Sequence, residues 1–266
     1  MDSKSKPLPP YRALLVVDVK DFSAVPGAHH AELTEAIPEI LRQTFLGCGL
    51  ERLWRDIKFE ASTGDGYALG FAAKHLPFLL SPFLPALQKE LTYRATVEEP
   101  SGVPQPLRMR VSVNVGPMTD SGAKRLGDGS GNARVETHRL LDCKPVRDLL
   151  ARSGPTTRVA AIVSRRAFED AVKSGFVDDD ENLYVAVDVT EKTYEGTAYV
   201  RVPNPSGDLI RNGLAPVLPA PTTPERPEPQ GGGIGRISGG VGNVIQHATG
   251  TINANNHGNR RRGGKG

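Results

Sequence analysis

Two aspartates occupy positions where a carboxylate could bind a ligand. Asp18 lies at the end of the apolar, β-branched run Arg12–Val19, and ligands in α/β layers usually bind beside the C-terminal ends of strands. Asp65 lies between two glycines in a short polar segment. Each residue alone also fits an ordinary role, because aspartate is common in turns and helix caps and Gly-Asp-Gly is common at hairpin tips.

The two aspartates carry more information as a pair. In a sheet of the β-α-β-β-α-β order the first strand lies next to the hairpin that carries Asp65, so Asp18 and Asp65 are expected to face each other. Two such carboxylates repel unless a cation joins them, and Mg²⁺ binds one or two carboxylates together with phosphate oxygens. Gly64 and Gly66 allow the backbone to approach a phosphate. The pattern predicts a metal and phosphate site.

Hydrophobic periodicity predicts the elements that must position these residues. Strands are expected at residues 12–19, 57–59, 67–71, 107–115, 159–163, 183–189 and 197–202. Helices are expected at residues 31–46, 81–96, 135–152 and 164–173, and Pro38 conflicts with the first of them unless that helix is kinked. The order predicts an α+β fold, a ferredoxin-like βαββαβ domain with extra strands and an extra helix.

The composition divides the chain into four segments. Residues 1–10 are a polar lead-in, residues 11–203 carry the predicted domain, and residues 204–230 are a proline-rich linker. Residues 231–266 contain five basic residues and no acid, so this tail carries +5 and the rest of the chain carries −2 of the net charge of +3. A mildly acidic body does not favour specific nucleic-acid binding, and the glycine-rich tail is expected to be disordered.

The two cysteines and the apolar runs bear on the cellular compartment. Cys48 and Cys143 suggest neither a disulfide framework nor a zinc cluster, so a reducing cytoplasm is expected. The N-terminus lacks the apolar segment of a secretory signal, and the longest apolar stretch, residues 76–87, contains three prolines. We expect a soluble, cytoplasmic protein without a membrane span.

Four segments together resemble the catalytic domain of class III adenylyl and guanylyl cyclases. Residues 17–23 (VDVKDFS) resemble the first strand and turn of that family, and residues 64–67 (GDGY) resemble its second metal-binding turn. Residues 113–117 (VNVGP) match the strand that ends in Gly-Pro, and residues 131–142 (GNARVETHRLLD) match the helix with the transition-state residues. The resemblance covers residues 11–203, with the motifs in the right order.

The resemblance implies a nucleotidyl cyclase, which forms a cyclic nucleotide and pyrophosphate from a nucleoside triphosphate and acts in signalling. Asp18 and Asp65, with the carbonyl of Val19, would bind two ions of Mg²⁺ or Mn²⁺. One ion would activate the ribose 3′-hydroxyl and the other would hold the triphosphate, as in other two-metal displacements.

The resemblance also implies roles for residues outside the metal pair. Arg139 would stabilise charge on the α-phosphate, because a guanidinium donates to two oxygens and keeps its charge. Asp128 aligns with the residue that reads the base in adenine-specific members, and Lys192 is a candidate phosphate-binding lysine. Family members are dimers, with the metal pair from one subunit and the arginine from the other, so a homodimer is expected.

The sequence departs from the family pattern at three positions. Val135 replaces the helix asparagine that contacts the ribose, Ala61 replaces a base-reading lysine, and Asp21 replaces the usual glycine of the first turn. Glu136 or Asn132 could take over the role of the asparagine. These departures leave open an alternative function, a weak or inactive cyclase-like module that senses nucleotides.

Residues 242–256 alternate apolar and polar side chains and contain several amides, no proline and no Asp, Glu, Lys or Arg. Such a segment can stack into a cross-β structure, and this one resembles short amyloid signalling motifs of the RHIM type. It could recruit a partner protein through β-stacking of like segments. A disordered tail, or weak binding of nucleic acid or anionic lipid by residues 260–262, is the alternative.

Overall fold

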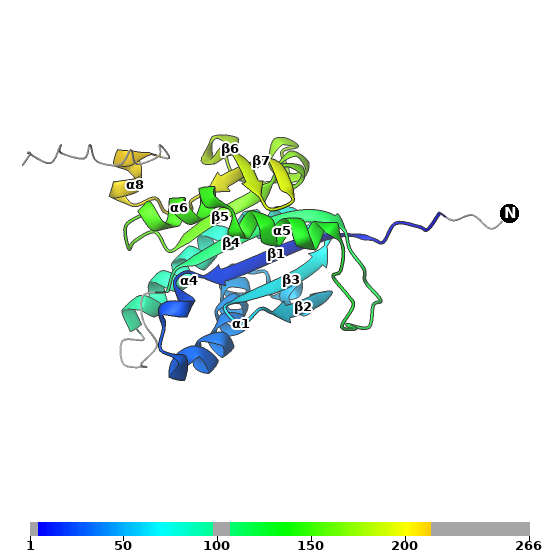
Figure 1. The fold of residues 1–266 in the computed structure, drawn as a ribbon, viewed down its shortest axis with the longest axis horizontal. Coiled ribbons are helices and arrows are strands. Elements are labelled where there is room, and N and C mark those ends of the chain that lie inside the picture. Colours follow the sequence, from blue (N-terminus) through cyan, green and yellow to red (C-terminus); the bar gives the residue numbers. More distant parts are fainter. Residues whose placement is uncertain (1–4, 98–106, 214–266) are drawn as a thin grey trace, which may run out of the picture. The chain divides into compact units, whose positions relative to one another are not determined.

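The computed structural model describes residues 5–97 and 107–213, all within the first of two compact units, Met1–Pro216 (Figure 1). These residues form a seven-stranded sheet with the strand order β2-β3-β1-β4-β5-β7-β6. The strands are β1 (Tyr11–Val19), β2 (Phe59–Ser62), β3 (Gly66–Ala72), β4 (Met109–Pro117), β5 (Val159–Ser164), β6 (Tyr184–Glu191) and β7 (Tyr194–Arg201).

The connections between the strands are mostly helical. The α-helices are α1 (His30–Gly47), α2 (Glu51–Arg55), α3 (Leu76–Leu80), α4 (Phe83–Val97), α5 (Asn132–Asp142), α6 (Lys144–Arg152), α7 (Arg165–Ala167) and α8 (Gly207–Asn212). Shorter turns are η1 (Phe22–Ala24), η2 (Gly27–His29), η3 (Ala73–His75), η5 (Glu181–Leu183) and the π-helix η4 (Phe168–Lys173). None of the helices in the described part of the chain combines the length and the apolar character that a membrane crossing requires.

The predicted ferredoxin-like core is confirmed. Strands β2, β3, β1 and β4 lie side by side in the order expected for a βαββαβ unit, and β5, β6 and β7 extend the sheet beyond β4. Strand β1 pairs antiparallel with both β3 and β4, whereas β4 and β5 are parallel. The predicted α+β class is therefore correct, and β1 occupies the centre of the core.

Alternation along β1 assigns its side chains to two different cores. Leu15 and Val17 pack with α1 and α4 in the larger core, whereas Leu14 and Val16 contact Ala133 and Leu141 of α5 in a smaller one. Because successive side chains of a strand point to opposite faces, Asp18 projects from the face covered by α5. The apolar residues of β1 thus direct one carboxylate to the α5 side of the sheet.

Two of the predicted helices are divided in the structure. The segment predicted as one helix at residues 135–152 forms α5, which begins at Asn132, and α6, with extended backbone at Cys143 between them. Helix α6 begins at Lys144 and has Pro145 in its first turn, where proline is favoured. The helix predicted at residues 81–96 begins at Phe83, because Ser81 precedes a proline and adopts an extended conformation. Pro38 lies inside α1, which continues past it.

Other differences concern boundaries. Strand β2 covers residues 59–62 instead of 57–59, and β7 begins at Tyr194 instead of residue 197. Helices α2 and α8 were not predicted, and α8 lies in the segment assigned to the proline-rich linker. The predicted tail, its residues 242–256 and the linker beyond residue 213 lie outside the described residues.

Gly66→Ala is expected to lower the free energy of unfolding by about 1–3 kcal/mol, the usual cost of overpacking. A Cβ at this position would lie 2.3 Å from the Val17 carbonyl oxygen and 2.8 Å from Thr63 Oγ1. Urea unfolding of both proteins measures the change. Gly47→Ala is the matched control, because a Cβ there meets nothing within 4 Å and alanine favours the helix. Equal stability of the two variants would show that the turn before β3 can accommodate a Cβ at residue 66, which contradicts the prediction.

Candidate metal and nucleotide site

Asp18 is a buried carboxylate held by an arginine of the neighbouring strand. In the sheet register Asp18 pairs with Gly66 of β3 on one side and with Arg110 of β4 on the other. Its side chain accepts a hydrogen bond from Arg110 Nε at 3.0 Å and a second one from Arg110 Nη2. Asp18 is only 8% exposed, so a buried charge is balanced by one guanidinium that contacts a single oxygen, Oδ2.

The turn that carries Asp65 is fastened directly to the end of β1. The Asp65 carbonyl accepts a hydrogen bond from the Val19 amide at 2.9 Å, and the Gly64 carbonyl accepts one from Thr34 Oγ1 of α1 at 2.8 Å. Gly64 adopts φ +91°, which favours glycine, and Gly66 lies too close to β1 for any side chain. These contacts place Asp65 beside Asp18, as the pairing of the strands predicted.

The electrostatics of Asp18 reflect burial and neighbouring charges. Burial raises the pKa of the Asp18 carboxyl from 3.8 to about 6, and the Arg110 guanidinium partly offsets this rise. The charges of Asp65 and of Asp142, the last residue of α5, raise it further. Two neighbouring carboxylates thus act on Asp18 at this end of β1, and a cation bound beside Asp18 would relieve the repulsion.

The donor set fits a hard divalent cation that is bound together with a substrate. Among the described residues no group of three or more His, Cys, Asp or Glu side chains could hold a metal on its own. Mg²⁺ rarely needs such a cage, because it is commonly held by one or two carboxylates and substrate phosphates. Asp18 keeps one oxygen away from Arg110, and Asp65 is only partly buried. Asp18, Asp65 and the adjoining Val19 carbonyl are the ligands that such an ion would use.

The turn after β1 uses an unusual backbone conformation. Asp21 adopts φ 61°, ψ 25°, in the left-handed region, and its carboxylate contacts Lys20. Aspartate is among the few residues with a side chain that tolerate this region. Asp21 therefore forms this turn without a glycine at its position.

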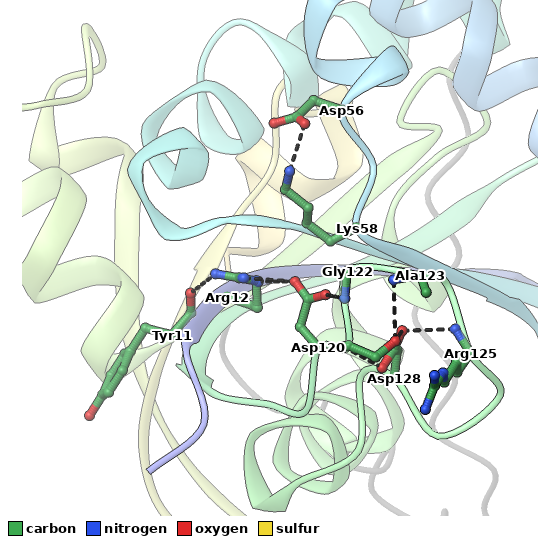
Figure 2. Close-up of polar contacts among 10 residues, drawn as sticks. Tyr11, Arg12, Asp56, Lys58, Asp120, Gly122, Ala123, Arg125 and Asp128 are labelled. Carbon is green, nitrogen blue, oxygen red and sulfur yellow. Dashed lines mark hydrogen bonds and ion pairs between the residues drawn. The ribbon is translucent and has the colours of Figure 1, made fainter. Parts of the chain in front are cut away.

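Asp128 is held by its own loop at the other end of the sheet (Figure 2). Its carboxylate accepts hydrogen bonds from the Ser121 amide at 2.8 Å, from Ser121 Oγ at 2.7 Å and from the Arg125 amide at 2.8 Å. The neighbouring Asp120 forms an ion pair with Arg12 near the start of β1, at 2.7 Å. Two of these bonds reach Oδ2 and one reaches Oδ1, so the loop itself fixes the orientation of the Asp128 carboxylate.

Arg139 and the turn with Lys192 lie beside a pocket between α5 and the start of β7. A cavity of about 400 Å³, the α5–β7 pocket, is lined by Asn132, Val135, Glu136 and Arg139 of α5 and by Thr193 and Tyr194. Lys192 lies next to Thr193 in the tight turn between β6 and β7, with φ 54°. Arg139 Nε is buried without a hydrogen-bond partner among the described residues. The structure thus places Arg139 and the turn that carries Lys192, the two basic residues predicted to contact phosphate, near one cavity.

The predicted site residues fall into separate groups within one chain. Asp18, Val19 and Asp65 meet with Gly64 and Gly66 at the C-terminal end of β1, whereas the loop of Asp128 is anchored at its start. Six residues of strand separate Arg12 from Asp18, which corresponds to roughly 20 Å. Within the described residues, the hydrogen bonds of the Asp128 carboxylate go to Ser121 and Arg125 and none links it to the carboxylate pair.

Arg110 and Asp142 are the neighbours of Asp18 that the sequence analysis missed. Strand alternation indicates that Arg110 lies on the polar face of its strand, but only the β1–β4 register places it opposite Asp18. Asp142 acts on Asp18 because α5 packs across β1 and ends there. Both neighbours depend on pairing and packing between distant segments.

No family model matches the sequence, and no curated protein matches it. Solved structures similar to this chain include the adenylyl cyclase CyaB from P. aeruginosa, with 13% identity and a TM-score of 0.48 over 75% of this chain and 96% of that one. The guanylyl cyclase Cya2 shows 16% identity and a TM-score of 0.45, covering 72% of this chain and 90% of that one. An adenylate/guanylate cyclase/hydrolase from Silicibacter pomeroyi shows 18% identity and a TM-score of 0.43. The match covers 73% of this chain and 97% of that one. At these values the similarity carries no functional argument, which rests on the residues themselves.

The pKa of Asp18 predicts how a metal ion stabilises the protein. Because the folded state holds the Asp18 proton more tightly than the unfolded state, the free energy of unfolding falls as the pH rises from about 4 to about 6. A cation that binds the ionised carboxylate removes this cost. Mn²⁺ is therefore expected to raise the Tm more at pH 7.5 than at pH 5, as measured by thermal unfolding. In Asp18→Asn this difference should vanish, and an equal Mn²⁺ effect at both pH values in the unmodified protein would contradict the assignment.

Proposed function

We propose that residues 11–203 form a metal-dependent nucleotidyl cyclase, a phosphorus–oxygen lyase that acts in signalling. The observation that carries the proposal is the buried carboxylate of Asp18 beside the glycine-flanked Asp65, with Arg110 contacting the first of them. Bound Mg²⁺ or Mn²⁺ would supply activation of the ribose 3′-hydroxyl and neutralisation of the triphosphate. The resemblance of residues 17–23 and 64–67 to cyclase motifs supports the same chemistry.

The carboxylates of Asp18 and Asp65 bind the metal ions and orient the triphosphate in this proposal. The glycine on each side of Asp65 leaves room for phosphate oxygens at the turn. When a cation compensates the charge of Asp18, Arg110 is free to donate to a phosphate oxygen, for which a guanidinium is well suited. The residues of this chain thereby hold the nucleotide in line for attack of the 3′-oxygen on the α-phosphorus and departure of pyrophosphate.

A homodimer supplies the remaining groups. Arg139 and Lys192 lie at the α5–β7 pocket and Asp128 is anchored near the start of β1, so one chain keeps Asp128 away from its own carboxylate pair. In a dimer, Arg139 of the partner subunit stabilises charge on the α-phosphate. Arg139 lines the α5–β7 pocket, which is where its guanidinium would meet the nucleotide of the other subunit. Each of the two sites then combines the metal pair of one chain with the arginine of the other.

A second candidate function is nucleotide binding with slow or no turnover. Val135 supports it, because this residue lines the α5–β7 pocket, is 51% exposed and offers no hydrogen-bonding group where the family motif has asparagine. In that case the domain acts as a nucleotide sensor, and the segment 242–256 recruits a partner. A cytoplasmic location suits both functions.

A turnover screen tests the cyclase proposal. Purified full-length protein with Mn²⁺ is incubated with ATP, GTP, CTP or UTP, and the cyclic product is measured by chromatography. We expect turnover of at least one triphosphate and a loss on the order of 100-fold or more in Asp65→Ala, because a metal ligand stabilises the transition state by several kcal/mol. Asp56→Ala is the matched control, since this exposed aspartate pairs with Lys58 away from the site. Four unchanged triphosphates with either Mg²⁺ or Mn²⁺ would refute the enzymatic function.

Substitution of Val135 separates a slow enzyme from an inactive one. Val135→Asn is expected to raise kcat by about tenfold, the effect of one hydrogen bond to the reacting nucleotide. Val135→Ala is the control, because it changes the volume without adding a donor or an acceptor. The rate of product formation at saturating triphosphate gives kcat for both variants. If Asn and Ala give the same kcat, the ribose is not bound at this face of α5.

A further inference from the structure

A pocket of about 690 Å³ opens at the opposite end of the sheet from Asp18. It lies where β4 and β5, the parallel pair, end, and it is bounded by α5, α7, η4 and the first residues of β7. Ligands of open α/β sheets bind in such crevices outside the carboxyl ends of parallel strands. We call it the β4–β5 edge pocket. Roughly 20 Å of β1, from Tyr11 to Asp18, separate it from the carboxylate pair.

Among the described residues, Arg166 of the β4–β5 edge pocket is an exposed arginine without an ion-pair partner. Arg165 donates a hydrogen bond to Glu169 at 2.8 Å, so these two charges compensate each other. Arg166 lies 6.0 Å above the ring of Tyr11, and its Nη1 would lie 3.7 Å from a Cβ at Gly116. Figure 2 shows that the Tyr11 ring points away from the ion pair of Arg12 and Asp120. Within residues 5–97 and 107–213, no hydrogen bond or ion pair engages the Arg166 guanidinium.

The other walls of the same pocket carry carboxylates. Glu136 comes from α5, Glu195 from β7 and Asp170 from η4. Across the described part of the chain, no ion pair or hydrogen bond reaches any of these three side chains. After the Arg165–Glu169 pair is discounted, three carboxylates and one guanidinium remain for a ligand. Their arrangement favours a molecule with one anionic group and more than one cationic group.

The local backbone also distinguishes this pocket. Asp170 and Glu169 belong to η4, a π-helix of six residues that continues α7. The π-helical geometry is rare and occurs frequently at functional sites. The floor is rigid, since the buried Asn114 amide donates to the Ala133 carbonyl at 3.1 Å and accepts from the Val115 amide at 2.8 Å. Neither feature is needed for the Asp18 site at the other end of the sheet.

We propose that the β4–β5 edge pocket binds a small zwitterion with an excess of amino groups, of the size of a dibasic dipeptide. Its carboxylate binds Arg166, and its ammonium groups bind Glu136 and Glu195. The volume falls in the range of pockets that enclose small organic molecules, which is larger than a single amino acid needs. Glu136 and Tyr194 also line the α5–β7 pocket, so the β4–β5 edge pocket adjoins the face of α5 that carries Arg139.

Calorimetric titration of the full-length protein with L-lysyl-L-lysine tests the proposal. Binding is expected with the dipeptide, and about tenfold weaker binding with its C-terminal amide, because the amide lacks the carboxylate that a charged hydrogen bond engages. Arg166→Gln should weaken binding of the dipeptide by a similar factor and should leave the affinity of the amide unchanged. This pattern couples the ligand carboxylate to Arg166.

Two further variants keep the test informative. Glu195→Gln should weaken the binding of the dipeptide and of its amide by the same factor, because both ligands carry the ammonium groups. Arg165→Gln is the matched control, since its charge is already paired with Glu169, and it should change the affinity by less than twofold. Absence of binding of L-lysyl-L-lysine at millimolar concentration would overturn the proposal. Binding that Arg166→Gln and Glu195→Gln leave unchanged would overturn it equally.

Discussion

The placement of a carboxylate in the interior of the sheet is the constraint on which the candidate active site depends. Asp18 belongs to the central strand β1, with β3 on one side and β4 on the other, so water reaches it poorly and its charge must be balanced by protein groups. Arg110 supplies one guanidinium, while Asp65 and Asp142 add repulsion. Burying a charge without a partner is costly. A cation bound at this end of β1 would therefore stabilise the folded protein.

The core converts this electrostatic arrangement into a fixed geometry. Leu14 and Val16 anchor one face of β1 to α5, and Leu15 and Val17 anchor the other to α1 and α4, so Asp18 has little freedom to move. The turn before β3 is fixed by the hydrogen bond between the Val19 amide and the Asp65 carbonyl. Preorganisation of this kind matters for metal-assisted chemistry, because ligands that are already in place need no reorganisation when the substrate binds.

The two ends of β1 serve different purposes in this interpretation. The C-terminal end gathers carboxylates beside one arginine, whereas the N-terminal end adjoins the loop of Asp128 and the β4–β5 edge pocket. The α5–β7 pocket with Arg139 adjoins the edge pocket, because Glu136 and Tyr194 line both. A ligand in the edge pocket would thus lie next to Arg139, the arginine that the proposed dimer contributes to the other subunit.

The sequence by itself determined the class of fold and indicated that Asp18 and Asp65 lie close together, because the apolar, β-branched run of residues 12–19 and the Gly-Asp-Gly turn are local signals. The helix predicted at residues 164–173 does begin there, where Ser164 Oγ accepts a hydrogen bond from the Ala167 amide. The contact between Arg110 and Asp18, the division of α5 from α6 at Cys143 and the capture of Asp128 by Ser121 and Arg125 were decided by the tertiary structure. Strand register, helix ends and loop conformation depend on contacts between residues far apart in the chain. A local sequence pattern does not show which of these contacts form.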